Sequence, residues 1–170
     1  MERNKIRALT YISLCVAIMS VVSQIAIPIG AVPFTLQVFV IALIGYFLGV
    51  KKGSVAVVTY ILLGLVGVPV FASFQGGAHT LIGYTGGFIF GYLPFALMCG
   101  IPGGKWSKIL CGAAGLFVCH LCGIVQYMLL SKLSFGISFM VVSLPYLLKD
   151  IALVLCAYFV SCTLHRKLRY

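Results

Sequence analysis

Asp150 is the acidic side chain that stands out, because it lies within a long apolar segment. The chain has only two acidic residues, and the other is Glu2. A carboxylate in apolar surroundings is costly, and it can accept hydrogen bonds from the N–H groups of a ligand. Asp150 could equally be an aspartate near the start of a helix, stabilised by the helix dipole or by an ion pair with Lys149. The residues alone support both interpretations.

Other polar and aromatic side chains in apolar segments are weaker candidates. Lys149 and Lys132 could each attract an anionic ligand, although for Lys132 we favour an amine that reaches the lipid headgroups. His79 could contact a carboxylate, but a histidine bonded to backbone is the commoner arrangement. Amides serve interhelical hydrogen bonds as often as ligands, and aromatic rings are common at membrane interfaces. The candidates of these two kinds are Gln24, Gln37, Gln75, Phe71, Phe74 and Tyr84.

The seven cysteines do not form a recognisable metal or redox motif. Cys-His-Leu-Cys at residues 119–122 lacks the order of haem attachment, and no second ligand pair lies at zinc spacing. The sequence also lacks a G-x-x-x-x-G-K-[ST] phosphate loop and the HExxH and GxSxG motifs. We therefore expect no cofactor, no metal and no enzymatic activity. A transport role would need partners that supply the energy.

Residues 67–87 form a glycine-rich segment without charged side chains. They include six of the nineteen glycines and lie within the uncharged stretch 53–104. Irregular backbone is not tolerated where it faces lipid, because unpaired N–H and C=O groups cost several kcal/mol each. The segment is therefore expected to join two membrane crossings and to fold back over the helices. We interpret residues 67–87 as a substrate lid.

The composition indicates an integral membrane protein. Hydrophobic residues make up 62% of the chain and charged residues 8%, whereas a soluble domain has roughly 25% charged residues. The 170 residues have room for about six crossings of roughly 20 residues each. We expect an all-α fold in which residues 1–170 form a single polytopic membrane domain.

The basic residues lie in clusters that suggest an orientation in the membrane. A net charge of +10 could indicate nucleic-acid binding, but the clusters alternate with stretches long enough for two crossings each. If every cluster is cytoplasmic, the chain forms six transmembrane helices with both termini cytoplasmic. Ten of the twelve basic residues then lie on one side, as the positive-inside rule expects. The clusters are Arg3, Lys5 and Arg7; Lys51 and Lys52; Lys105 and Lys108; and Arg166, Lys167 and Arg169.

Prolines and glycines set the expected helix boundaries. The first helix is expected to end before the Pro-Ile-Gly sequence at residues 28–30. The fourth is expected to kink at Pro94 and to end at the Pro-Gly-Gly sequence at residues 102–104. The six expected helices cover residues 7–27, 36–50, 54–66, 86–101, 109–130 and 145–164.

Several short motifs occur in a characteristic order. They are VPFTLQ at residues 32–37, GVPVFA at 67–72 followed by Gly76 and Gly77, and Gly83 followed by TGG at 85–87. Together with residues 145–150 they resemble the BioY family, the biotin-binding S components of energy-coupling factor (ECF) transporters. Because the motifs agree in order and spacing, this resemblance is more specific than a single glycine-rich match.

The resemblance implies an S-component fold in the plasma membrane, with an extracytoplasmic biotin site beneath the lid. It also implies partners, namely a membrane scaffold subunit and two cytoplasmic ATPases. Asp150 corresponds to a family aspartate that accepts hydrogen bonds from the ureido N–H groups of biotin. The substrate-binding residues expected on these grounds are Asp150, Gln37, Phe71, Gln75, Gly76, Gly77, His79, Tyr84, Thr85, Gly86 and Lys149.

The chain departs from the family pattern at two positions. It has Tyr84 where the family usually has proline, and Leu153 where the family often has a lysine three residues after Asp150. Lys149 precedes Asp150 directly, and adjacent helical residues point about 100° apart. Lys149 therefore does not simply replace the family lysine, and the sequence leaves the partner of the biotin carboxylate open.

Ser13 and Ala17 are small residues spaced four apart in the first expected helix. Such spacing lets helices approach closely in lipid, and the family has an Ala-x-x-x-Ala pattern there that contacts the scaffold subunit. We expect these residues to bind that partner, and packing inside the bundle is the alternative. The alternatives for the whole chain are an S component for thiamin or riboflavin, a stand-alone channel and a membrane-embedded enzyme.

Overall fold

Long helices dominate the fold of this chain. The structure is a computed structural model that describes residues 2–30 and 32–168. Its helices are α1 (Glu2–Val22), α2 (Gln37–Leu65), α3 (Ala78–Ile82), α4 (Gly86–Cys99), α5 (Lys105–Ser131), α6 (Phe135–Val142) and α7 (Leu144–Leu168). A 3-10 turn, η1 (Ala72–Phe74), and two strands, β1 (Ala26–Ile27) and β2 (Phe34–Thr35), complete the described elements.

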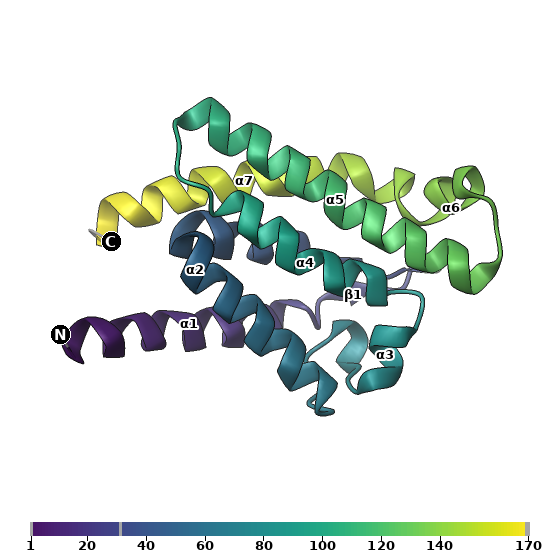
Figure 1. Ribbon diagram of the computed structural model, residues 1–170, viewed down its shortest axis with the longest axis horizontal. Coiled ribbons are helices and arrows are strands. Elements are labelled where there is room, and N and C mark those ends of the chain that lie inside the picture. Colours follow the sequence, from purple (N-terminus) through teal and green to yellow (C-terminus); the bar gives the residue numbers. More distant parts are fainter. Residues whose placement is uncertain (1, 31, 169–170) are drawn as a thin grey trace.

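Helix α2 consists of two limbs that meet at Gly49. This glycine has φ 74° and ψ 178°, outside the helical region, and a positive φ of this size favours glycine. Figure 1 shows the two limbs of α2 diverging from the end of the molecule at which both termini lie. The helices expected over residues 36–50 and 54–66 are therefore the limbs of one element. The break comes at residue 49 rather than after residue 50.

The lengths of the described helices agree with a membrane protein. Helices α1, α2, α5 and α7 are long and apolar enough to cross a membrane, and α4 is a shorter apolar helix. Their exposed side chains include many large apolar ones, such as Leu9, Leu14 and Phe117, as expected of a surface that faces lipid. A helical membrane fold is thus confirmed, whereas six crossings and cytoplasmic termini stay predictions.

The connection between α1 and α2 differs from the expected one. We expected the first helix to reach residue 27, but α1 ends at Val22. Ala26 pairs with Thr35 and Ile27 with Phe34 in a short antiparallel ladder, which withdraws these residues from the helix. Two further short helices, α3 within the lid and α6 before α7, also lie outside the expected boundaries. Pro94 lies inside α4 as expected.

Helix α4 lies at the centre of the bundle and packs against both α2 and α5. Phe95 of α4 and Ile41 of α2 are completely buried, as is Met19 of α1. Helices α1 and α7 each pack against α2. The hydrophobic core therefore extends along the helix bundle, and the connections between the helices lie at its two ends.

The two ends of the bundle have different character (Figure 1). The start of α1, the break in α2, the α4–α5 loop and the end of α7 gather at one end, which we call the basic end. The basic clusters lie in these segments, apart from Arg169, which is outside the described residues. The strands, α3 and α6 lie at the opposite end, which we call the lid end.

Candidate functional site

A cavity of about 250 Å³ lies between the α1–α2 connection, the lid and helices α2, α4, α5 and α7. Its size is near the lower limit of typical small-molecule sites. Apolar side chains such as Phe71, Phe88 and Ile89 form part of its lining, and polar groups converge on it from several helices. Such an apolar pocket with a few placed polar groups is typical of a site for a small ligand.

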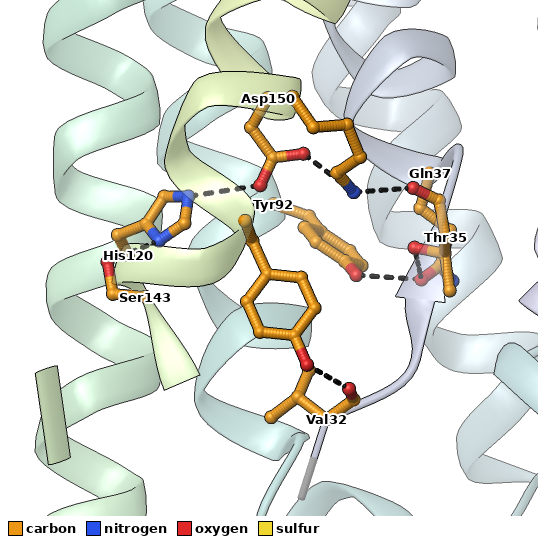
Figure 2. A network of polar contacts seen from close by, with 9 residues as sticks. Val32, Thr35, Gln37, Tyr92, His120, Ser143 and Asp150 are labelled. Carbon is orange, nitrogen blue, oxygen red and sulfur yellow. Dashed lines mark hydrogen bonds and ion pairs between the residues drawn. The ribbon is translucent and has the colours of Figure 1, made fainter. Parts of the chain in front are cut away.

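Asp150 lies in the wall of this cavity and is 3% exposed. Its Oδ2 atom lies 3.2 Å from His120 Nε2, and its Oδ1 atom forms an ion pair with Lys149 Nζ at 2.9 Å. Oδ1 nevertheless has no hydrogen-bond partner among the described residues, so the lysine neutralises the carboxylate without a well-directed hydrogen bond. Figure 2 shows Asp150 facing His120 across the gap between two helices. One oxygen of a buried carboxylate thus retains acceptor capacity.

Ser143, His120 and Asp150 form a chain of polar contacts. Ser143 Oγ lies 2.8 Å from His120 Nδ1, and His120 Nε2 lies 3.2 Å from Asp150 Oδ2. In a Ser-His-Asp hydrolase the serine contacts Nε2 and the aspartate contacts Nδ1, which is the reverse of the arrangement here. Ser143 is also completely buried and is not part of the cavity lining. The arrangement is therefore not that of a hydrolase triad, and Ser143 is not placed to act as a nucleophile on a ligand in the cavity.

Lys149 links the carboxylate to the α1–α2 connection. Its amine donates a hydrogen bond to the carbonyl oxygen of Thr35 at 2.7 Å. It also lies 4.3 Å from the centre of the Phe34 ring, a distance suited to a cation–π interaction. One turn earlier, the Tyr146 hydroxyl lies 2.7 Å from the Ile29 carbonyl oxygen. The first turns of α7 thus hold the connection in place over the cavity.

The opposite wall of the cavity carries a neutral network centred on Gln37. Its Oε1 accepts a hydrogen bond from the Tyr92 hydroxyl at 3.0 Å, and its Nε2 donates one to the Tyr60 hydroxyl at 3.0 Å. The Thr35 hydroxyl also donates to Oε1, at 3.2 Å. In Figure 2, Tyr92 points from α4 towards Gln37. Both the oxygen and the nitrogen of the amide are therefore hydrogen-bonded within the protein.

The first part of the lid is held by α2 and by the turn that follows α1. The carbonyl oxygen of Val70 accepts hydrogen bonds from the hydroxyls of Tyr60, at 2.8 Å, and Ser23. Gln24 holds the lid at two points, because its Nε2 donates to the Pro69 carbonyl at 3.2 Å and its Oε1 accepts from the Phe74 N–H at 2.7 Å. Phe74 has φ 58°, a left-handed conformation that is unfavourable for such a residue.

Phe71 anchors the same part of the lid by packing. It is 1% exposed, and its ring lies where a side chain on Gly64 would project, 2.0 Å from an ideal Cβ position. The absence of a side chain at Gly64 therefore makes room for the ring. The second part of the lid is held by Gln126 of α5, whose Nε2 donates to the carbonyls of Leu81 at 2.8 Å and Gly83 at 2.7 Å.

The structure divides the expected substrate-binding residues into two groups. Asp150, Gln37, Phe71, Gln75, Thr85 and Lys149 line the cavity. Gly76, Gly77, His79, Tyr84 and Gly86 do not line it. His79 is exposed and lies 3.4 Å from the Thr80 hydroxyl, and Tyr84 packs against Tyr127 at the surface. Gly76 and Gly86 instead pack against carbonyl groups of the lid itself, those of Val68 and Leu81, and Gly77 has φ 91°.

Sequence reasoning missed His120, Tyr92 and Tyr146, which also line the cavity. His120 was considered only as part of a cysteine motif. A histidine in the middle of an apolar helix is itself a signal of function, because such residues are costly in a membrane. Tyr92 and Tyr146 carried no comparable signal, since tyrosine is common at membrane interfaces. Among the described residues no group of three or more potential ligands could hold a metal.

Ser13 and Ala17 lie on an exposed face of α1. Val16 and Met19, which lie between and beyond them in the sequence, are buried against the bundle. The Ser13–Ala17 face is therefore not used for packing within the described part of this chain.

Comparisons with known proteins show what this chain is similar to. A model of the BioY family matches residues 1–170. The biotin transporter BioY of Thermotoga maritima is 46% identical over 112 residues, which cover 64% of this chain and 66% of that protein. The probable biotin transporter BioY of Pyrococcus horikoshii is 38% identical over 148 residues, which cover 86% of this chain and 89% of that protein.

A solved structure has the same fold. The crystal structure of the S-component for biotin from an ECF-type ABC transporter superposes with a TM-score of 0.91, covering 98% of this chain and 94% of that one at 22% identity. The expected S-component fold is thereby confirmed. The curated relatives are named as transporters and not as enzymes.

Proposed function

The chain belongs to the BioY family, a family of transporters and not of enzymes, and we propose that it is the biotin-binding S component of an ECF transporter. In this role it captures biotin in the cavity at the lid end and catalyses no reaction. The names of its relatives and the S-component fold support the proposal.

The observation that carries the proposal is the buried carboxylate, one oxygen of which is paired with Lys149 but accepts no hydrogen bond from the described residues. The ureido ring of biotin has two N–H donors, and a carboxylate is the strongest common acceptor for them. Asp150 lines the cavity, and its Oδ1 has no hydrogen-bond partner within the described part of the chain. A ligand N–H group at this oxygen would complete its hydrogen bonding.

Lys149 also lines the cavity, and its amine lies 2.9 Å from Asp150 Oδ1, at the end of the site that we assign to the ureido group. Its side chain is 17% exposed and thus mostly buried. The amine contacts Asp150 and Thr35, so its positive charge lies beside the carboxylate that would accept the ureido N–H group. The remaining lining, with Gln37, Gln75, Thr85 and Phe71, would surround the rings and the acyl chain.

The protein is proposed to lie in the plasma membrane. In the proposed orientation the lid end is outside the cell and the basic end is in the cytoplasm. The gathering of basic clusters at one end supports it through the positive-inside rule. Six crossings follow if both limbs of α2 and the shorter α4 each span the membrane. Reporters fused after residue 166 and within the lid should lie on opposite sides of the membrane, and reporters on the same side would exclude this topology.

The proposed partners are a membrane scaffold subunit and two cytoplasmic ATPases, because no phosphate-binding loop occurs in this sequence. The exposed Ser13–Ala17 face of α1 is the proposed contact with the scaffold. Residues 1–170 would form one domain whose task is to bind the substrate.

Thermal stabilisation by a panel of vitamins tests the proposed substrate. A ligand present at about 100 times its Kd adds roughly 2.7 kcal/mol to the free energy of unfolding. We expect biotin to raise the melting temperature of the purified protein, and thiamin and riboflavin to leave it unchanged. Stabilisation by one of the other vitamins alone would assign a different substrate, and no stabilisation by any of them would favour a channel or an enzyme.

A further inference from the structure

The carboxylate of Asp150 is held unsymmetrically. Oδ2 contacts His120 Nε2 at 3.2 Å, while Oδ1 lies 2.9 Å from Lys149 Nζ without a hydrogen bond from any described residue. Rotation of a carboxylate about its last side-chain bond is only weakly restricted. The observed orientation therefore depends on the groups around it.

His120 is itself fixed on two sides. Its Nδ1 lies 2.8 Å from the Ser143 hydroxyl, and its ring meets the Phe88 ring edge-on with centres 5.7 Å apart. In a neutral imidazole whose Nδ1 accepts from Ser143, Nε2 carries the hydrogen and donates to Asp150. Both ring nitrogens are then occupied. Although His120 lines the cavity, it has no polar atom left for a ligand.

Lys149 competes for the same carboxylate. Its amine is attached to the Thr35 carbonyl at 2.7 Å and lies over the Phe34 ring. If the bond from His120 were absent, the carboxylate would be free to turn towards this amine and share both oxygens with it. The acceptor capacity of Oδ1 towards a ligand would then fall.

We propose that His120, held by Ser143, is a positioning residue that sets specificity for the ureido group of the ligand. It fixes Asp150 Oδ2 and thereby presents Oδ1 to a ligand N–H group. The inference rests on the proposed function, because it takes biotin as the ligand. It gives a role to His120 and Ser143, two buried residues that do not contact the ligand through polar atoms. In the sequence, His120 lies 30 positions from Asp150, and Ser143 lies 23 positions from His120.

The test compares two ligands, biotin and an analogue with both ureido nitrogens methylated. Equilibrium binding of each is measured to wild type, His120→Leu, His120→Gln and Ser143→Ala. Ser138→Ala is the matched control, because Ser138 is also completely buried but its hydroxyl has no hydrogen-bond partner among the described residues. Wild-type binding of biotin establishes the proposed function separately.

We expect His120→Leu to weaken biotin binding about tenfold and to change binding of the methylated analogue little, since one charge-assisted hydrogen bond loses its orientation. Ser143→Ala should give a smaller change of the same kind. His120→Gln should restore part of the preference for biotin over the methylated analogue through its amide N–H. Ser138→Ala should match wild type. Equal weakening of both ligands in His120→Leu and Ser143→Ala, or an unchanged preference in both, would overturn the positioning role. If His120→Leu does not fold, the Ser143→Ala and Ser138→Ala pair decides in the same way.

Discussion

The wall of the cavity that α5 and α7 form differs from the lid in the kinds of residue that it contains. The wall presents a carboxylate that is paired with a lysine and contacted by a histidine, and one of its oxygens has no hydrogen-bond partner among the described residues. The lid, residues 67–87, has no charged side chain and is held through its backbone carbonyls by Gln24 and Gln126. The wall is therefore suited to recognise the polar part of a ligand, and the lid is suited to cover the ligand and to release it.

This comparison predicts a large effect on affinity for Asp150→Asn. The substitution keeps the shape but removes the charge and replaces an acceptor oxygen with a donor amide. Loss of a charge-assisted hydrogen bond costs about 1.5–3 kcal/mol, so we expect the Kd for biotin to rise about ten- to hundredfold. Titration calorimetry on the purified protein measures the change. Wild-type affinity would mean that Asp150 serves only the helix and its ion pair.

A smaller effect, on kinetics, is expected for Gln24→Leu in the turn that follows α1. It removes the hydrogen bonds to the Pro69 carbonyl and the Phe74 N–H at the first part of the lid. Both hydrogen bonds lie near the surface, so together they stabilise the closed lid by about 1 kcal/mol. Dissociation of biotin should therefore become about fivefold faster. Thr59→Val is a matched control, because among the described residues the Thr59 hydroxyl donates to Val55 within its own helix. Unchanged dissociation in Gln24→Leu would show that this part of the lid stays shut without the glutamine.

The smallest effect on binding is expected for Ala17→Trp, which lies away from both regions. The residue is exposed on α1, so the isolated subunit should keep its affinity for biotin. Energised uptake by the complete transporter should be lost, because the large ring would separate α1 from the scaffold subunit. Uptake assays and binding assays on the same variant measure the two effects. Loss of binding as well would place Ala17 within the packing of this chain.

The break between two long helices at residues 67–87 was predictable from sequence because glycines and prolines are concentrated there in an uncharged stretch, whereas its role as a lid stays a prediction. Asp150 could be selected from the sequence as a candidate binding residue because a carboxylate is costly in an apolar helix. The pairing of Asp150 with His120 was not predictable, since the two lie on different helices and only the packing of α5 against α7 brings them together. The use of Lys149 to hold Thr35 likewise depends on the β1–β2 pairing, which ends α1 earlier than its apolar pattern indicates.

Determination of the structure with biotin bound tests the central proposal, that the wall recognises the ligand and the lid covers it. We expect biotin in the cavity of about 250 Å³, with a ureido nitrogen within about 3.2 Å of Asp150 Oδ1 and residues 67–87 closed over it. Biotin bound elsewhere, or bound in the cavity with its ureido ring turned away from Asp150, would contradict the account.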